Sequence, residues 1–152
     1  MPPRHQLFVD MSAALTGFSP IQLRGTGMVA GYLAELDAIL SEGFVDGLLS
    51  AFPRPADVAG AVEPGAVDTV LDHPLWGPPA RAIAIMWYCG TWTQLPDGWR
   101  VEHGAAARDT NHVVSAAAYQ AGLQWVAAGA HPIGARQQGF GSWSFPVEDL
   151  AS

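Results

Sequence analysis

Apolar residues recur at helical spacing along most of the chain, and glycine or proline ends each run. Leu7, Met11 and Leu15 lie four residues apart, and Gly17 follows them. Because glycine readily takes the positive φ that closes a helix, a short first helix is predicted to end at Gly17.

A second helix is predicted to start at Ser19. This serine is a favourable N-cap, Pro20 suits the first helical position, and Gln22 completes a capping box. The helix is expected to reach about residue 40, because an apolar stripe continues through Val29, Leu33, Leu36 and Leu40. Its three glycines, Gly25, Gly27 and Gly31, lower its propensity. A short third helix is predicted from Val45, Leu48, Leu49 and Phe52, with Pro53 and Pro55 stopping it.

A helix over residues 81–92 is predicted to lie in the middle of the fold. Pro78 and Pro79 favour its start, and Gly90 favours its end. Ile83 and Trp87 lie four residues apart, so they form a large apolar face that small alanines flank. We expect such a helix to be packed on several sides.

The remaining segments contain weaker signals. Residues 53–68 are predicted to be a surface connection, and residues 94–109 a turn-rich stretch with a few extended residues around Trp99. Ser115 is predicted to cap a last helix that ends at Gly129 and shows one face through Tyr119, Gly122, Leu123 and Val126. Beyond it, residues 130–147 are rich in glycine and aromatic residues without a period. They predict an extended tail that must lie along another surface.

These patterns together predict an all-α protein, a compact bundle of about five helices with long Pro/Gly-rich connections and an extended aromatic C-terminal tail. Residues 1–152 are interpreted as one domain, with a helical body over about 5–129 and a docking tail over about 130–147.

The composition narrows the classes of partner. The chain has 49% hydrophobic and 14% charged residues, fewer charges than is usual for a globular protein. The net charge is −7 and the few basic residues are scattered arginines, which argues against nucleic acid. No apolar run reaches the roughly 18–20 residues that a membrane span needs. The low charge therefore indicates that part of the surface is covered by something else.

Candidate catalytic and metal-binding groups are sparse. The histidines are not spaced as zinc ligands, and Cys89 has no second cysteine and follows two aromatic residues, which favours a buried thiol. Asp109 and His112 can form an acid–base pair, with Tyr119 nearby in sequence, although helix capping by Asp109 is favoured. No glycine-rich motif for a dinucleotide or phosphate is complete, so no cofactor is expected on this chain.

Three blocks of sequence carry a family resemblance. They are residues 8–18, residues 82–92 with Trp87-Tyr88-Cys89-Gly90 at their end, and residues 113–143, which close on Gly139-Phe140-Gly141-Ser142-Trp143. These blocks resemble the small, or gamma, subunit of bacterial membrane-associated, FAD-dependent sorbitol and glucose dehydrogenase complexes. The family usually has threonine at the position of Cys89, a nearly isosteric change.

The resemblance implies a non-catalytic accessory or chaperone subunit. Its partner would be a large subunit of the glucose–methanol–choline type, which binds FAD and oxidises a sugar or polyol, and a cytochrome c subunit often accepts the electrons. In this family a twin-arginine signal on the small subunit can carry the pair to the periplasm. The N-terminal residues here show no such signal, so the chain as given predicts a cytoplasmic protein, and a periplasmic or membrane-associated one if it is exported with its partner.

We expect the partner interface to use a set of mostly aromatic residues. Its members are Trp87, Tyr88, Trp92, His131, Pro132, Phe140, Trp143 and Phe145. Two alternatives stay open: a small stand-alone helical enzyme or ligand-binding domain with a site near Asp109, His112 and Tyr119, and a homo-oligomer whose tail exchanges between copies.

Overall fold

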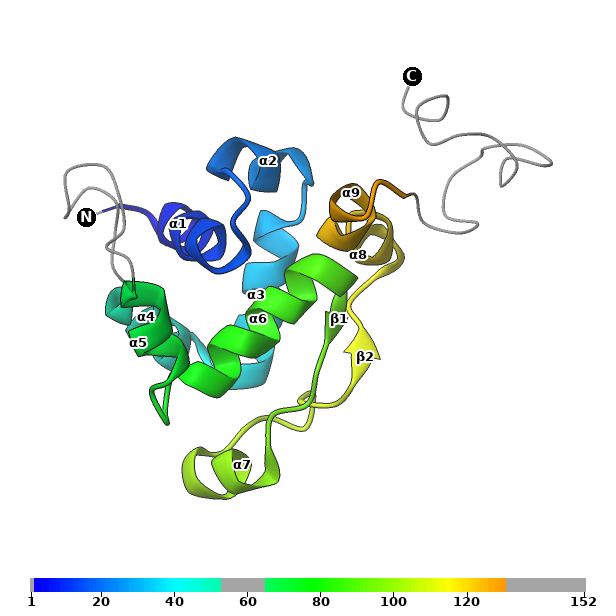
Figure 1. Cartoon of the computed structure of the whole chain (residues 1–152). Helices are drawn as coiled ribbons and strands as arrows, with labels where there is room; N and C mark the ends of the chain where they lie inside the picture. Colours follow the sequence, from blue (N-terminus) through cyan, green and yellow to red (C-terminus); the bar gives the residue numbers. More distant parts are fainter. Residues whose placement is uncertain (1, 53–64, 131–152) are drawn as a thin grey trace.

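The computed structural model describes residues 2–52 and 65–130, and these residues form a mostly helical fold with one small sheet (Figure 1). The helices are α1 (Arg4–Thr16), α2 (Pro20–Gly25), α3 (Val29–Leu40), α4 (Glu42–Ala51), α5 (Ala66–Leu71), α6 (Gly77–Cys89), α7 (Asp97–His103), α8 (Ala116–Gln120) and α9 (Leu123–Ala127). The strands are β1 (Thr91–Trp92) and β2 (His112–Val113). The predicted helical character is confirmed, but the helices are shorter and more numerous than five.

Helix α6 is the central element, as its pattern predicted. It runs through the middle of the fold and contacts α1, α5 and α9 (Figure 1). Trp87 is buried between Phe8, whose ring centroid lies 5.9 Å away, and Tyr32, which packs edge-on at 4.8 Å. The indole Nε1 of Trp87 donates to Ser12 Oγ at 2.9 Å. This bond satisfies the polar atom that burial of the ring removes from water.

The local signals for helix ends are confirmed. Gly17 and Gly90 close α1 and α6 with φ of 79° and 69°, in the left-handed region that glycine tolerates. At the start of α2, Gln22 N donates to Ser19 Oγ at 3.2 Å, and Ser19 N donates to Gln22 Oε1 at 2.9 Å. Both bonds of the predicted capping box are present.

The prediction of one helix over residues 20–40 is wrong. Gly27 has φ of 74°, so the helix is interrupted between α2 and α3. Thr26 stabilises the break: its hydroxyl donates to Leu23 O at 2.6 Å and accepts from Met28 N at 3.2 Å. The apolar stripe continued across a turn because both helices bury side chains in the same core.

Two segments predicted as irregular contain helices. The predicted connection over residues 53–68 includes the start of α5 (Ala66–Leu71), whereas its residues 53–64 lie outside the described part of the chain. The segment predicted as turn-rich with extended residues forms α7, which includes Trp99. Trp99 packs edge-on against Phe44 at 5.5 Å, and its Nε1 donates to Leu75 O at 3.0 Å. These tertiary contacts favour a short helix that has little periodic signal of its own.

The predicted last helix is also divided. Ser115 caps α8 by accepting from Ala118 N at 3.0 Å, as expected, but the chain leaves the helix at Gly122 before α9 begins. A Cβ at Gly122 would lie 2.7 Å from Tyr88 O. Glycine is required here because the chain passes directly over the end of α6.

The small sheet joins the two ends of a long connecting segment, residues 93–111, which we call the excursion. Thr91 lies opposite Val113 and Trp92 opposite His112 in an antiparallel pair. Residues 93–111, which include α7, extend from this pair toward the lower part of Figure 1. No helix within the described ranges is long and apolar enough to cross a membrane.

Candidate functional sites

The structure assigns Asp109 to a buried cluster of structural contacts. Its carboxylate is fully buried, and Oδ1 accepts from Trp92 Nε1 at 2.8 Å and from Leu95 N at 3.1 Å. Arg100 Nε lies 2.9 Å from Oδ2 as an ion pair, although the geometry of that contact is not that of a hydrogen bond. Asp109 therefore fixes the excursion over residues 93–111 against β1. It is not the helix cap that the sequence favoured.

His112 faces a different carboxylate. Its Nε2 lies 2.6 Å from Glu35 Oε1, and its Nδ1 lies 2.6 Å from Thr110 O. The two ring nitrogens are thus engaged by α3 on one side and by Thr110 on the other. The acid–base pair that the spacing of Asp109 and His112 allowed is not formed here, because each side chain is engaged by its own set of partners.

Glu35 is a buried carboxylate that the sequence patterns did not single out. It is 8% exposed and accepts from Arg108 Nε at 2.8 Å and from Arg108 Nη2 at 2.9 Å. Burial raises the pKa of Glu35, but hydrogen bonds and charge from Arg108 and His112 outweigh it and hold the pKa below its usual value. One signal in the sequence could have indicated that Glu35 is buried. It lies on the face of α3 that otherwise buries Tyr32, Leu36 and Ile39.

Tyr119 belongs to neither cluster. Its ring packs edge-on against Trp125 at 5.5 Å, and Trp125 Nε1 donates to Tyr119 O at 2.9 Å. These contacts hold α8 against α9. The three residues expected to form an alternative catalytic site therefore have separate structural surroundings.

The expected partner interface divides into three groups. Trp87 and Trp92 are 1% and 0% exposed, so they support the surface from the core and present no surface to a partner in this conformation. Tyr88 is half-buried. The other residues of the set, His131, Pro132, Phe140, Trp143 and Phe145, lie outside the described part of the chain.

Tyr88 lies where three distant segments meet. Its hydroxyl donates to Thr16 O at 2.8 Å, and its ring meets Phe18 edge-on at 5.9 Å. On its other side, Val114 N donates to Gly90 O at 2.9 Å. Ideal Cβ atoms on Gly90 and Gly122 would lie 2.5 Å from Ala118 O and 2.7 Å from Tyr88 O, so these backbones are in direct contact. We call this meeting of residues 16–18, 88–90 and 114–122 the Tyr88 junction.

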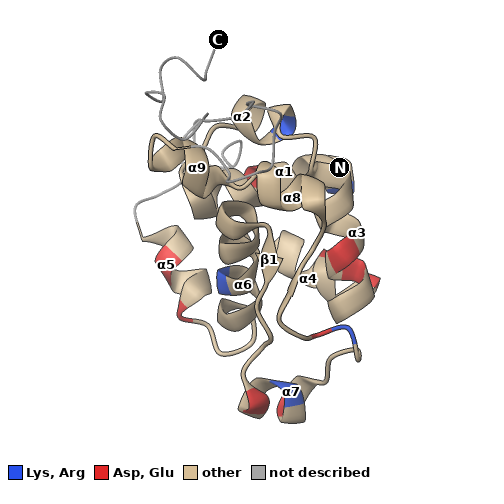
Figure 2. Cartoon of the chain, turned by 90° about the vertical axis from the view of Figure 1, so that its right-hand side faces the viewer, with Lys and Arg blue, Asp and Glu red and all other residues tan. Residues whose placement is uncertain are grey.

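The α8 and α9 side of the Tyr88 junction carries no charged side chain. Residues 113–130 contain no charged side chain, and the ribbon of α8 and α9 is accordingly uncoloured by charge in Figure 2. Val126 on α9 is 69% exposed and Ile21 on α2 is 81% exposed. Helices α2 and α9 lie at the same end of the molecule in both views (Figures 1 and 2).

The thiol and the histidines form no metal cluster within the described residues. Cys89 is half-buried, and its Sγ lies 3.8 Å from Gln124 Oε1, a weak contact that holds α6 near α9. Across residues 2–52 and 65–130, no group of three His, Cys, Asp or Glu residues could hold a metal ion.

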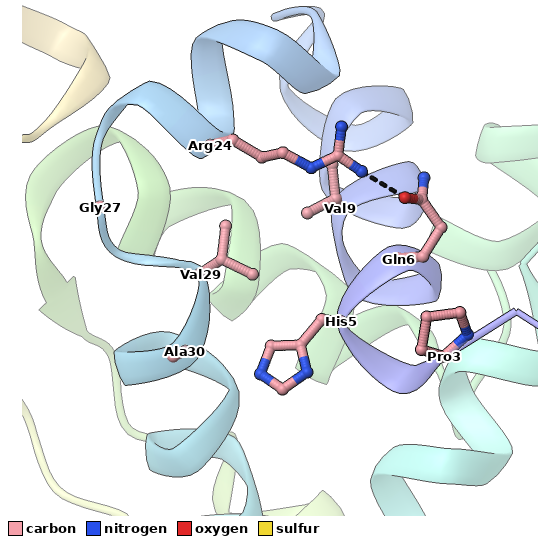
Figure 3. A pocket seen from close by; sticks show the side chains of 8 residues that line it. All are labelled: Pro3, His5, Gln6, Val9, Arg24, Gly27, Val29 and Ala30. Carbon is pink, nitrogen blue, oxygen red and sulfur yellow. Dashed lines mark hydrogen bonds between the residues drawn. The ribbon is translucent and has the colours of Figure 1, made fainter.

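A hollow of about 360 Å³ opens between α1, α2 and α3 (Figure 3). Its lining consists of Pro3, His5, Gln6, Val9, Arg24, Gly27, Val29 and Ala30. Arg24 reaches from α2 across the upper side of the hollow and donates to Gln6 Oε1 on α1, while the His5 ring lies on the lower side (Figure 3). The hollow combines apolar walls with two side chains that can donate hydrogen bonds to an anion.

Comparison with known protein families, with curated protein sequences and with solved structures gave no match to this chain.

Proposed function

We propose that this chain is a non-catalytic accessory subunit that binds and stabilises a large FAD-dependent sugar or polyol dehydrogenase subunit of the glucose–methanol–choline type. The flavin and the oxidation chemistry belong to the large subunit in this proposal. The chain itself contributes a folding platform and a docking surface.

The observation that carries the proposal is the Tyr88 junction. The first of the three blocks that resemble the small-subunit family ends more than 60 positions before the second begins, yet residues from all three blocks meet there. Phe18 comes from the first block, Tyr88 and Gly90 from the second, and Ala118 and Gly122 from the third. A resemblance that marks one contiguous structural unit is better support than three unrelated short matches.

The surface beside the junction suits a permanent protein contact. Interfaces of obligate complexes are depleted in charge at their centres and resemble opened protein cores. The uncharged stretch 113–130, with exposed Val126, has this character, and the aromatic tail residues 131–147 follow it directly. We therefore place the docking surface on α8, α9 and the tail.

The non-catalytic part of the proposal is supported by how the buried polar groups are used. Glu35 and Asp109 hold loops against the helical core, and each is engaged by arginine. Ser12 and Thr16 accept or donate within the core beside α6. A catalytic acid or base needs access to a substrate proton, whereas the contacts of these groups are made with other residues of the fold.

The decisive experiment is co-expression of this chain with a large flavin dehydrogenase subunit encoded beside it, followed by affinity capture. We expect a stoichiometric yellow complex with flavin absorbance. Two changes should abolish capture: truncation after residue 130 and Val126→Asp, which places a charge in the proposed surface. Val101→Asp is the matched control, because Val101 is 88% exposed on α7, away from the junction.

Some results would refute the accessory role. A colourless monomer recovered beside a soluble, well-expressed partner would contradict complex formation. A complex that survives both the truncation and Val126→Asp would contradict the assignment of the surface, even if the complex itself is real.

A further inference from the structure

We propose that the hollow between α1, α2 and α3 binds a small anion with an apolar body, in the class of aliphatic or aromatic monocarboxylates, with Arg24 as its charged partner. The same chemistry is offered by a free carboxylic acid and by the C-terminal residue of a peptide. This proposal does not depend on the accessory role.

Arg24 differs from the other arginines of the described residues in what it faces. Four of them lie beside carboxylates: Arg4 at 2.7 Å from Asp37, Arg81 at 3.8 Å from Asp72, Arg100 at 2.9 Å from Asp109 and Arg108 at 2.8 Å from Glu35. Arg24 instead donates to the neutral amide oxygen of Gln6. Its guanidinium has five N–H donors, so most of them are available to an anion.

Gln6 holds the guanidinium over the hollow. Its amide nitrogen donates to Asp10 Oδ1 at 2.8 Å, which turns the amide oxygen toward Arg24. Asp10 is therefore engaged through Gln6, and within residues 2–52 and 65–130 no ion pair joins it to Arg24. A preorganised arginine loses less conformational entropy when it binds than a freely moving one.

The walls below the guanidinium are apolar. Val9 is buried, Val29 is half-buried, and Pro3 and Ala30 are the other apolar residues of the lining apart from Gly27. The volume of about 360 Å³ lies at the lower end of the range typical of small-molecule pockets. His5 lines the side of the hollow opposite Arg24 (Figure 3). This arrangement fits a carboxylate at the rim and a short apolar chain or ring inside.

The test is an NMR titration of the full ¹⁵N-labelled chain with hexanoate and, separately, with hexanol, which has a similar chain but no charge. We expect saturable shifts at the amides of Gly27, Val29 and Ala30 with hexanoate. The affinity for hexanol should be lower than that for hexanoate by about tenfold or more, because hexanol lacks the charge-assisted hydrogen bonds to Arg24.

Two variants locate the charge. Arg24→Gln should lower the affinity for hexanoate by about tenfold, to the affinity that wild type has for hexanol. The spectrum should be unchanged far from the hollow. Arg81→Gln is the matched control, an exposed arginine on α6 at a different hollow, and should leave hexanoate binding unchanged. Equal affinity for hexanoate and hexanol, or for wild type and Arg24→Gln, would overturn the proposal, as would no saturable shift at the three amides.

A last comparison separates the two sources of carboxylate. A short peptide ending in leucine is titrated with a free C-terminus and with an amidated one. Binding of the free-acid peptide at least tenfold tighter than hexanoate identifies a chain end as the ligand class, and weaker binding identifies a free small acid. Equal binding of the free and amidated peptides, together with no response to hexanoate, would count against a carboxylate site.

Discussion

Gly90→Ala tests whether the Tyr88 junction is built on backbone contact. Gly90 closes α6 with φ of 69° and lies against α8. An added Cβ would lie 2.5 Å from both C and O of Ala118 and 2.7 Å from Tyr119 N. These neighbours are backbone atoms, so no side-chain rotation can make room for the methyl group.

Two costs are expected to add in this variant. The left-handed backbone costs a residue with Cβ about 1–2 kcal/mol, offset by roughly 0.5 kcal/mol because alanine restricts the unfolded chain. The ordinary contact distance begins at 3.4 Å, so α8 must move by about 0.9 Å. Overpacking of this kind costs about 1–3 kcal/mol. The loss in free energy of unfolding should therefore be about 2–4 kcal/mol.

Gly17→Ala is the matched control. Gly17 closes α1 with φ of 79°, but a Cβ there would have no atom within 4 Å. This variant should lose only about 1 kcal/mol, which is the backbone cost alone. Urea unfolding followed by tryptophan fluorescence gives both values, and hydrogen exchange of the Tyr119 amide reports local release of α8.

One result would show that α8 does not depend on Gly90. If Gly90→Ala loses no more stability than Gly17→Ala and the Tyr119 amide keeps its protection, α8 does not rest on the end of α6. A changed m value with an unchanged midpoint would instead indicate an altered denatured state.

Three further predictions concern polar contacts. Glu35→Gln should lower the urea midpoint at pH 7; because the pKa of Glu35 is depressed in the fold, the difference from wild type should shrink as the pH falls below about 4.5. Trp92→Phe should cost about 2–3 kcal/mol, because it leaves a buried carboxylate oxygen of Asp109 short of a donor. Trp99→Phe, which removes a bond to a neutral carbonyl, should cost less. Ser19→Ala should cost about 1 kcal/mol by removing the cap of α2.

Each of these predictions has a result that contradicts it. A constant gap between Glu35→Gln and wild type from pH 7 to pH 3 would mean that the Glu35 charge adds no stability. Equal losses for the two tryptophan variants would mean that the charge of the acceptor does not matter. A midpoint unchanged in Ser19→Ala, measured against the exposed control Ser50→Ala, would show that the cap is dispensable.

The sequence alone determined the features that depend on a few adjacent residues. The capping box at Ser19, the glycine ends at Gly17 and Gly90, and the central place of α6 follow from side-chain chemistry within one or two helical turns. The mostly helical character follows in the same way from apolar spacing. Such signals are local, so they can be recognised from adjacent residues without knowledge of the tertiary contacts.

The tertiary structure decided what lies beyond that range. Helix α7 forms because Trp99 docks between α4 and the chain before α6, and the break at Gly122 exists because α8 and α9 must cross the end of α6. The same holds for the partners of the charged groups: Glu35 meets Arg108 and His112 across more than 70 positions, and Asp109 meets Trp92 across the small sheet. Pairings over such distances depend on how the helices close on one another, and a pattern of neighbouring residues contains no information about that closure.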